Sequence, residues 1–278
     1  MGPDDAEALH PLVAAGARVA WGTLNAAIDH RLRYAFSDSR ALPETVERGI
    51  AGAFRIAAPG TGPALRQAGD DLSLLLSELI SEEQPASRSR PLMLPTTSEA
   101  HFARLCYAMA WFEEVYRTRR LWPGTPLGDA RPGFTVKDML AAVPAYAVED
   151  LVAQAEIASE ALHELRAECP PAQVYAGPDF AGSPDVEGAD ADLIVGGLLI
   201  DTKGTVAPSR LRKPEFYQLL GYALLDYDDE YRIGGLGFYL SRFGRLITWP
   251  VDEYLALLGS SRSLPSLRAA CAAALAIR

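Results

Sequence analysis

Two adjacent glycines between short apolar runs place the strongest constraint on how this chain folds. Residues 193–195 (LIV) precede Gly196-Gly197, and residues 198–200 (LLI) follow them. Such a pattern predicts a β-hairpin with a two-residue turn. The turn fixes the register of the strands. The expected pairs are Val195 with Leu198, Ile194 with Leu199, Leu193 with Ile200, and Asp192 with Asp201.

Charged side chains gather on one face of this hairpin. Because side chains alternate along a strand, Lys203 shares the face of Asp201, and Asp190 shares that of Asp192. Carboxylates about 5 Å apart repel each other unless they share a cation, so the pair predicts a Mg²⁺ or Mn²⁺ site. The alternative is a solvated hairpin end with an ordinary Asp190–Lys203 ion pair. The opposite face is apolar and is expected to be buried: Leu193, Val195, Leu198 and Ile200.

In order and spacing, Asp192 and the triplet Asp201-Thr202-Lys203 resemble the active-site pattern of the PD-(D/E)XK nuclease superfamily. In that superfamily an acid begins one strand, and an acid-x-Lys triplet lies on its hairpin partner. Pro184-Asp185 offers a literal Pro-Asp, but it lies in a loop rich in glycine and proline, seven residues before Asp192. Asp192 is preferred because it faces Asp201.

A second motif follows in the segment RKPEFYQLLGYALLDY, which predicts a helix over residues 214–227. Gln218 and Tyr222 lie four residues apart, on one face of that helix. They resemble the Gln-x-x-x-Tyr motif of the RecB-like branch of the superfamily, where these residues bind DNA or orient the lysine. The other interpretation is an exposed glutamine and a half-buried tyrosine without a shared role.

The resemblance covers roughly residues 148–250 and implies a restriction-endonuclease-like core, a central mixed sheet flanked by helices. It implies that Asp192, Asp201 and the Thr202 carbonyl hold Mg²⁺ or Mn²⁺. Lys203 would assist the attacking hydroxide and the developing charge, and Gln218 and Tyr222 would position the substrate or the lysine. Family members often add one acid from the preceding helix. The candidates here are Glu156, Glu160 and Glu164.

The pattern of elements predicts an α/β protein in two parts. Helical periodicity marks four segments before residue 145, at 19–36, 42–57, 72–80 and 101–116, with loops at 57–63 and 84–98. Another helix is expected near 148–168, and strands within 173–180, 191–202, 232–240 and 245–251. We therefore expect a helical N-terminal region over 1–145 and a nuclease-like domain over 146–278.

The arginine-rich end of the helical segment 101–122 has two interpretations. Arg117, Arg119 and Arg120 stand beside aromatic residues, an arrangement able to grip phosphates and stack on bases. The simpler interpretation is a core helix whose last-turn cations complement the helix dipole. Its expected core positions are Phe102, Leu105, Cys106, Met109, Phe112, Val115 and Tyr116.

Composition limits the setting in which such a chain works. With 49% hydrophobic and 22% charged residues the chain is globular. Three dispersed cysteines and an acidic N-terminus without a signal-peptide pattern favour the reducing cytoplasm and argue against a membrane partner. All but three of the 26 basic residues are arginines, which makes Lys203 a rare residue type here. Only an ammonium combines a compact charge with the ability to lose a proton.

The net charge of -10 opposes binding to nucleic acid by a uniformly charged surface. Much of it comes from two acidic clusters, within 185–192 and 226–230, so we expect modest DNA affinity that depends on a divalent metal or a recruiting partner. The expected function is a metal-dependent nuclease that acts on DNA more than RNA, alone or as a homodimer. The alternative is a catalytically inactive scaffold that binds a protein partner.

Overall fold

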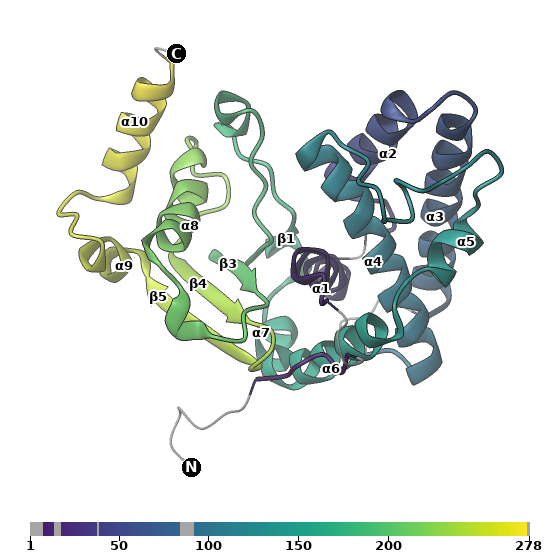
Figure 1. Ribbon diagram of the computed structural model, residues 1–278. Helices are drawn as coiled ribbons and strands as arrows, with labels where there is room; N and C mark the ends of the chain where they lie inside the picture. The colour runs from purple at the N-terminus through teal and green to yellow at the C-terminus, as the bar shows by residue number, and fades with distance from the viewer. Residues whose placement is uncertain (1–7, 14–17, 38, 84–91, 277–278) are drawn as a thin grey trace. The chain divides into compact units, whose positions relative to one another are not determined.

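The computed structural model describes residues 8–13, 18–37, 39–83 and 92–276, so most of the expected loop at 84–98 lies outside the described residues. The chain divides into two compact units, and the boundary along the chain falls between Ser159 and Glu160 (Figure 1). We call Leu9–Ser159 the helical unit and Glu160–Arg278 the mixed unit. We expected the division at residue 145, whereas it falls inside the helix α6, Ala145–Ala161.

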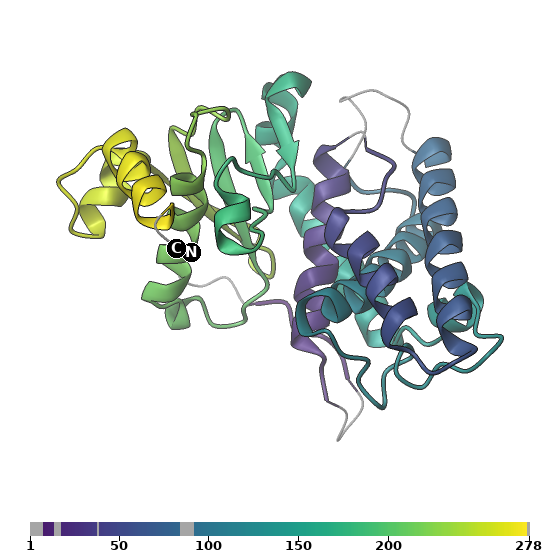
Figure 2. The ribbon, with the colours of Figure 1, turned by 90° about the horizontal axis from the view of Figure 1, so that it is seen from above.

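The helical unit is built on a central helix, α4 (Thr96–Thr118), which packs against four others (Figure 2). The four helices expected from periodicity are all present. α3 begins earlier than expected, so the end of the expected 57–63 loop is helical, because Pro63 lies in the first turn, where its missing N–H breaks no intrahelical bond. The neighbours of α4 are α1 (Trp21–Phe36), α2 (Glu44–Ile56), α3 (Thr61–Glu83) and α5 (Val136–Ala141).

Two glycines let α2 approach α4 closely. A Cβ atom added to Gly49 would lie 1.9 Å from the backbone oxygen of Phe112. One at Gly52 would lie 3.6 Å from Val115, an ordinary contact distance. The pairing of 49 with 112 and 52 with 115 shows that the two helices run in the same direction here, so their C-terminal ends lie together.

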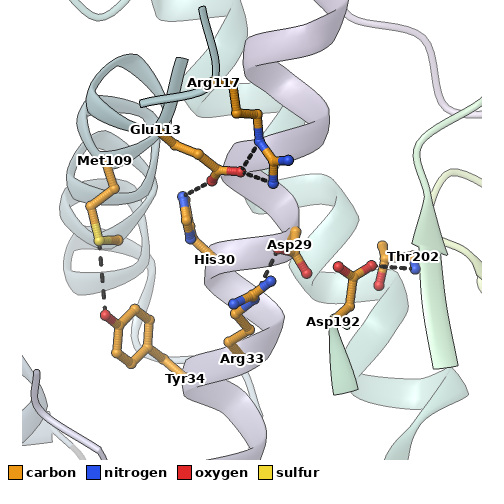
Figure 3. Close-up of polar contacts among 9 residues, drawn as sticks. All are labelled: Asp29, His30, Arg33, Tyr34, Met109, Glu113, Arg117, Asp192 and Thr202. Carbon is orange, nitrogen blue, oxygen red and sulfur yellow. Dashed lines mark hydrogen bonds and ion pairs between the residues drawn. The ribbon is translucent and has the colours of Figure 1, made fainter. Parts of the chain in front are cut away.

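Buried polar side chains tie α1 to α4 in two places. The Arg31 guanidinium donates to both carboxylate oxygens of Glu99, at 2.6 and 2.8 Å, and Glu99 also accepts from the Leu94 N–H at 2.9 Å. About four turns further along α4, Glu113 lies between His30, at 2.9 Å, and Arg117 (Figure 3). Burial raises the pKa of Glu113, but His30 and Arg117 outweigh it and lower that pKa to about 2.

The mixed unit contains a five-stranded sheet with the order β1-β2-β3-β4-β5. The first three strands form an antiparallel meander, β4 runs parallel to β3, and β5 is antiparallel to β4. The strands are β1 (Val174–Ala176), β2 (Leu193–Val195), β3 (Leu198–Lys203), β4 (Gly235–Leu240) and β5 (Arg245–Pro250). All lie in the segments expected to form strands, except that β3 extends one residue further, to Lys203.

Helices accompany this sheet along the chain. α7 (His163–Glu168) precedes β1, α8 (Lys213–Leu225) joins β3 to β4, and α9 (Val251–Leu257) and α10 (Leu264–Leu275) end the chain. Short 3-10 turns occur at Pro171–Gln173, Ser183–Val186 and Pro208–Arg210. The structure is therefore α/β, with a mixed sheet and flanking helices as expected. α8 agrees closely with the helix expected over 214–227.

Both faces of the central hairpin are buried. Leu193, Val195 and Ile200 are buried as expected and Leu198 is half-buried, but Ile194 and Leu199, on the face of Asp201, are also fully buried. They join Leu219 and Ala223 of α8 in one core cluster, together with Leu236 and Phe238 of β4. A helix thus covers the face on which the charged residues lie, as is usual around parallel strand pairs.

The acidic cluster at 226–230 has a structural partner on α10. Arg268 donates to Asp226 at 2.7 Å, to Asp229 at 2.5 Å and to the Ala223 carbonyl at 2.8 Å. Two acids of that cluster therefore anchor the C-terminal helix. Among the described residues, none of the helices has the length and apolar character needed to cross a membrane.

Candidate functional site

The hairpin predicted from Gly196-Gly197 forms with the expected register. Leu193, Ile194 and Val195 pair with Ile200, Leu199 and Leu198. Gly196 and Gly197 have φ of 58° and 78°, and a Cβ on Gly197 would lie 2.7 Å from the Arg232 oxygen. Both backbone shape and close approach therefore require glycine here. Asp192 and Asp201 lie at the other end of the hairpin, away from the turn.

Asp192 lies at the beginning of β2 but outside its ladder, which ends one pair earlier than predicted. Its carbonyl accepts from the Gly177 N–H at 2.9 Å, on the side of β1. Its side chain turns toward β3, where Oδ2 accepts from the Thr202 N–H at 2.7 Å (Figure 3). A carboxylate thus takes the place of the next backbone acceptor, which fixes Asp192 beside the Asp201-Thr202-Lys203 triplet.

Asp201 is a buried acid at the end of β3. It is 4% exposed, and its Oδ2 lies 2.6 Å from the Lys203 Nζ. Burial and the negative charge of Asp192 raise the pKa of Asp201 to about 7, although Lys203 opposes the shift. The hairpin end is therefore not the solvated surface that the alternative interpretation required. Asp201 is poised to bind either a proton or a cation.

Gln218 and Tyr222 of α8 extend the contacts of Lys203. The Lys203 ammonium lies 3.5 Å from Gln218 Oε1, the limit of a hydrogen bond. Gln218 Nε2 in turn donates to the Tyr222 hydroxyl at 2.9 Å. The structure thus brings together Asp201, Lys203, Gln218 and Tyr222 in one continuous row of polar contacts, with Asp192 beside its first member.

Aromatic packing holds this row in place. The Tyr222 ring stacks on Phe180, 6.2 Å between centroids and 21° between planes. Burial, followed by the charges of Asp192 and Asp201, raises the pKa of the Tyr222 hydroxyl. The Lys203 ammonium lies 6.0 Å from the centre of the Phe238 ring. Tyr222 is therefore a neutral donor and acceptor whose position is fixed by the core.

The other acids considered from sequence lie elsewhere. Glu156, Glu160 and Glu164 are all exposed, and within the described residues none contributes a hydrogen bond or ion pair to the row. The helix expected over 148–168 breaks at Leu162, so Glu164 belongs to α7. Asp185 accepts from the Tyr227 hydroxyl at 3.0 Å.

Glu215 is a residue near the site that sequence reasoning missed. Its carboxylate accepts from the Arg212 N–H at 2.9 Å and so caps the beginning of α8. Its charge raises the pKa of Asp201, while backbone hydrogen bonds and then Lys203 lower its own. A glutamate in the first turn after Lys213-Pro214 is a visible capping signal. The exposed Arg212 and Lys213 stand at the same helix end.

The donor set fits Mg²⁺ or Mn²⁺ bound through few protein ligands. Asp192 and Asp201 are the carboxylates available, and their mutual repulsion is part of what a cation would relieve. Mg²⁺ commonly keeps several waters and takes one or two protein carboxylates. Among the described residues there is no group of three or more His, Cys, Asp or Glu arranged to hold a metal. A closed all-protein cage is therefore not what this set forms.

The candidate site is thus a cluster of five side chains from the residue before β2, from β3 and from α8, at the end of the hairpin opposite its turn. Two carboxylates, one ammonium, one amide and one phenol meet there, with the Phe180 ring stacked on Tyr222 and the Phe238 ring beneath the Lys203 ammonium. Comparison of the chain with protein-family models, with curated proteins and with solved structures found no match.

Proposed function

We propose that this protein is a metal-dependent nuclease that hydrolyses phosphodiester bonds, in DNA in preference to RNA. The observation that carries the proposal is the row from Asp201 through Lys203 and Gln218 to Tyr222, with Asp192 beside Asp201. Two carboxylates can hold a hard cation, and a lysine beside them can stabilise negative charge on a phosphate. This combination is suited to phosphoryl chemistry.

The order of elements also supports the proposal. A helix, three antiparallel strands, a helix and two further strands follow one another in the mixed unit. This is the order implied by the resemblance of Asp192, Asp201-Thr202-Lys203 and Gln218-x-x-x-Tyr222 to PD-(D/E)XK nucleases of the RecB-like branch. Asp201 and Lys203 lie on β3, Asp192 directly precedes β2, and Gln218 and Tyr222 lie on α8, an arrangement that supports the proposal.

Each side chain would have a distinct task. Asp192 and Asp201, with the Thr202 carbonyl, would hold the cation, and a bound Mg²⁺ would act as a Lewis acid toward the phosphodiester. Lys203 would place a positive charge where negative charge grows on the phosphate oxygens or the attacking hydroxide. Gln218 would hold the Lys203 ammonium in position, and Tyr222 would hold the Gln218 amide.

Cleavage assays with defined substrates test the proposal. Purified protein is incubated with linear, nicked and single-stranded DNA, and with RNA of matched sequence, in Mg²⁺ and in EDTA. We expect cleavage in Mg²⁺ that D201N and K203A reduce at least 100-fold, because D201N removes a charged ligand of the cation and K203A removes the positive charge that meets the developing negative charge. Y222F should cost about tenfold, since the Gln218 amide loses its acceptor.

Matched substitutions separate these effects from general damage. D70N and K137A remove the same charges from exposed positions of α3 and α5, and Y217F removes an exposed hydroxyl from α8. All three should cleave as the wild type does. Cleavage that D201N and K203A leave unchanged would show that another site is responsible. Faster cleavage of RNA than of DNA would overturn the substrate preference.

A catalytically inactive scaffold is the second candidate function. The observation in its favour is that the Lys203 ammonium lies 2.6 Å from Asp201 Oδ2 and offsets part of the carboxylate charge. Calorimetric titration with Mn²⁺ distinguishes the two functions. Heat that D192N abolishes supports the nuclease, because that variant keeps an oxygen for the Thr202 N–H but loses the charge. No Mn²⁺ binding, together with a stable protein complex, supports the scaffold.

A further inference from the structure

The C-terminal end of α4 exposes a positively charged surface in an acidic protein. Residues 115–128 include Arg117, Arg119 and Arg120 but no Asp or Glu. All three arginines are exposed, whereas the expected core positions from Phe102 to Val115 are buried and Tyr116, also expected in the core, is only half-buried. Core packing therefore accounts for one face of this segment only. The dipole interpretation accounts for Arg117, the basic residue in the last turn of α4, which also pairs with Glu113.

Aromatic rings hold the other arginines. The Arg119 and Arg48 guanidinium carbons lie 5.0 and 5.9 Å from the centre of the Tyr116 ring. The Arg120 guanidinium carbon lies 5.3 Å from the centre of the Trp122 ring. A guanidinium placed over a ring keeps its N–H groups at the edge, where they can donate to a phosphate. We call Arg48, Tyr116, Arg119, Arg120 and Trp122 the arginine surface.

Two details suit this surface to an anionic ligand. Within the part of the chain that the structure describes, Arg119 and Arg120 form no ion pair with a carboxylate, whereas Arg48 also contacts Glu44 at 2.5 Å. Arg119 ends α4 with φ of 56°, a left-handed conformation in which glycine is the ordinary residue. A strained arginine held over a tyrosine is a feature that stability alone does not explain.

We propose that the arginine surface binds the phosphate backbone of single-stranded nucleic acid, with a base against the exposed part of Trp122. Trp122 is 40% exposed, and base stacking on an aromatic ring combined with arginine–phosphate contacts is how proteins bind unpaired strands. The identity of the ligand rests on the proposed nuclease function. The surface lies wholly on the helical unit, to which the proposed catalysis assigns no role.

Fluorescence anisotropy with the full chain tests the inference. A labelled 30-nucleotide single strand and its duplex are titrated in EDTA, where no metal-dependent cleavage takes place. We expect R119Q/R120Q to weaken single-strand binding at least tenfold at low salt. The slope of log K against log salt should become shallower by about 1.4, because two phosphate contacts are lost. Duplex should bind more weakly than the single strand.

Control variants separate binding from charge and from folding. R66Q/R262Q removes two exposed arginines from α3 and from the loop before α10, and it should bind as the wild type does. R119G removes the side chain but suits the left-handed conformation, so its melting temperature should stay at or above that of the wild type while binding weakens. R119K should restore part of the affinity, because charge is kept but the stacked plane is lost.

The outcomes distinguish this inference from the proposed function. Equal affinity of R119Q/R120Q and R66Q/R262Q overturns the arginine surface, even if D201N abolishes cleavage. Weakened binding by R119Q/R120Q, with cleavage untouched by D201N, supports the surface and overturns the active site. Binding to anionic lipid vesicles that depends on Arg119 and Arg120, without binding to the single strand, overturns the inference.

Discussion

At the scale of single residues, Asp201 combines burial with a charge that burial disfavours. It lies beside Asp192 on one side and Lys203 on the other, and its pKa is raised to about 7. A divalent cation bound there would therefore compete with a proton near neutral pH. The arrangement is stable enough to fold, yet it stores an unfavourable interaction that ligand binding would relieve.

D201N should therefore stabilise the metal-free protein. With a folded pKa above the unfolded value, ionised Asp201 costs nothing below pH 4 and costs most above pH 7. At pH 8 in EDTA we expect D201N to raise the unfolding free energy of the mixed unit by on the order of 2 kcal/mol. The gain should disappear near pH 4. Urea unfolding at both values measures it, and equal or lower stability at pH 8 would contradict the assignment.

The pKa of Glu113 is shifted in the opposite direction to the pKa of Asp201. Its pKa is lowered to about 2 because His30 and Arg117 stabilise the carboxylate more than burial disfavours it. This contribution to stability is complete above about pH 4.5 and is lost as the pH falls toward 2. E113Q should lower the stability of the helical unit by on the order of 2 kcal/mol at pH 7 and by almost nothing at pH 2. Thermal unfolding monitored by the helical circular dichroism signal across this range measures the difference.

At the scale of elements, the hairpin and α8 differ in how far sequence determines them. The Gly196-Gly197 turn sets the β2–β3 register locally, so the pairs were predictable. The beginning and face of α8 were also predictable from Pro214 and its apolar residues. Which strand α8 crosses was not, because that depends on packing of Leu219 and Ala223 against β3 and β4.

Close packing of α2 on α4 leads to a prediction about Gly49. Its Cβ would lie 1.9 Å from a backbone oxygen, which cannot move without shifting α4. G49A should cost about 2 kcal/mol or more, because the strain exceeds the gain in helix propensity. G22A in α1, where nothing lies within 4 Å, is the matched control and should be neutral or stabilising. Similar melting temperatures for the two variants would show that the helices do not pack this closely.

At the scale of the whole molecule, the net charge of -10 is the sum of local groups of charged residues with separate roles. Asp226 and Asp229 anchor α10 through Arg268, and Asp192 belongs to the candidate site. The arginine surface is locally positive although the net charge of the whole chain is negative. An acidic protein with such a surface is expected to bind nucleic acid modestly and with marked dependence on salt.

Binding of a divalent cation should be visible as stabilisation. A ligand that binds only the folded state at 100 times its Kd adds about 2.7 kcal/mol to the unfolding free energy. We expect Mn²⁺ to raise the Tm of the wild type in proportion, and D192N to lose the shift while keeping its fold. D252N, which changes an exposed acid of α9, should keep the shift. An equal shift in D192N would place the cation elsewhere.

The sequence by itself determined the hairpin, its register and the identity of the five candidate site residues. The hairpin, its register and the facing of Asp192 and Asp201 depend on two glycines and on alternation along a strand, whereas Gln218 and Tyr222 were identified from the resemblance to the Gln-x-x-x-Tyr motif. The tertiary structure decided that Asp201 is buried and that Gln218 reaches Lys203. It also decided that Glu215 lies close enough to Asp201 to raise its pKa. Among the described residues, Arg119 and Arg120 have no carboxylate partner. Such facts depend on which distant segments pack together, and no local pattern records that.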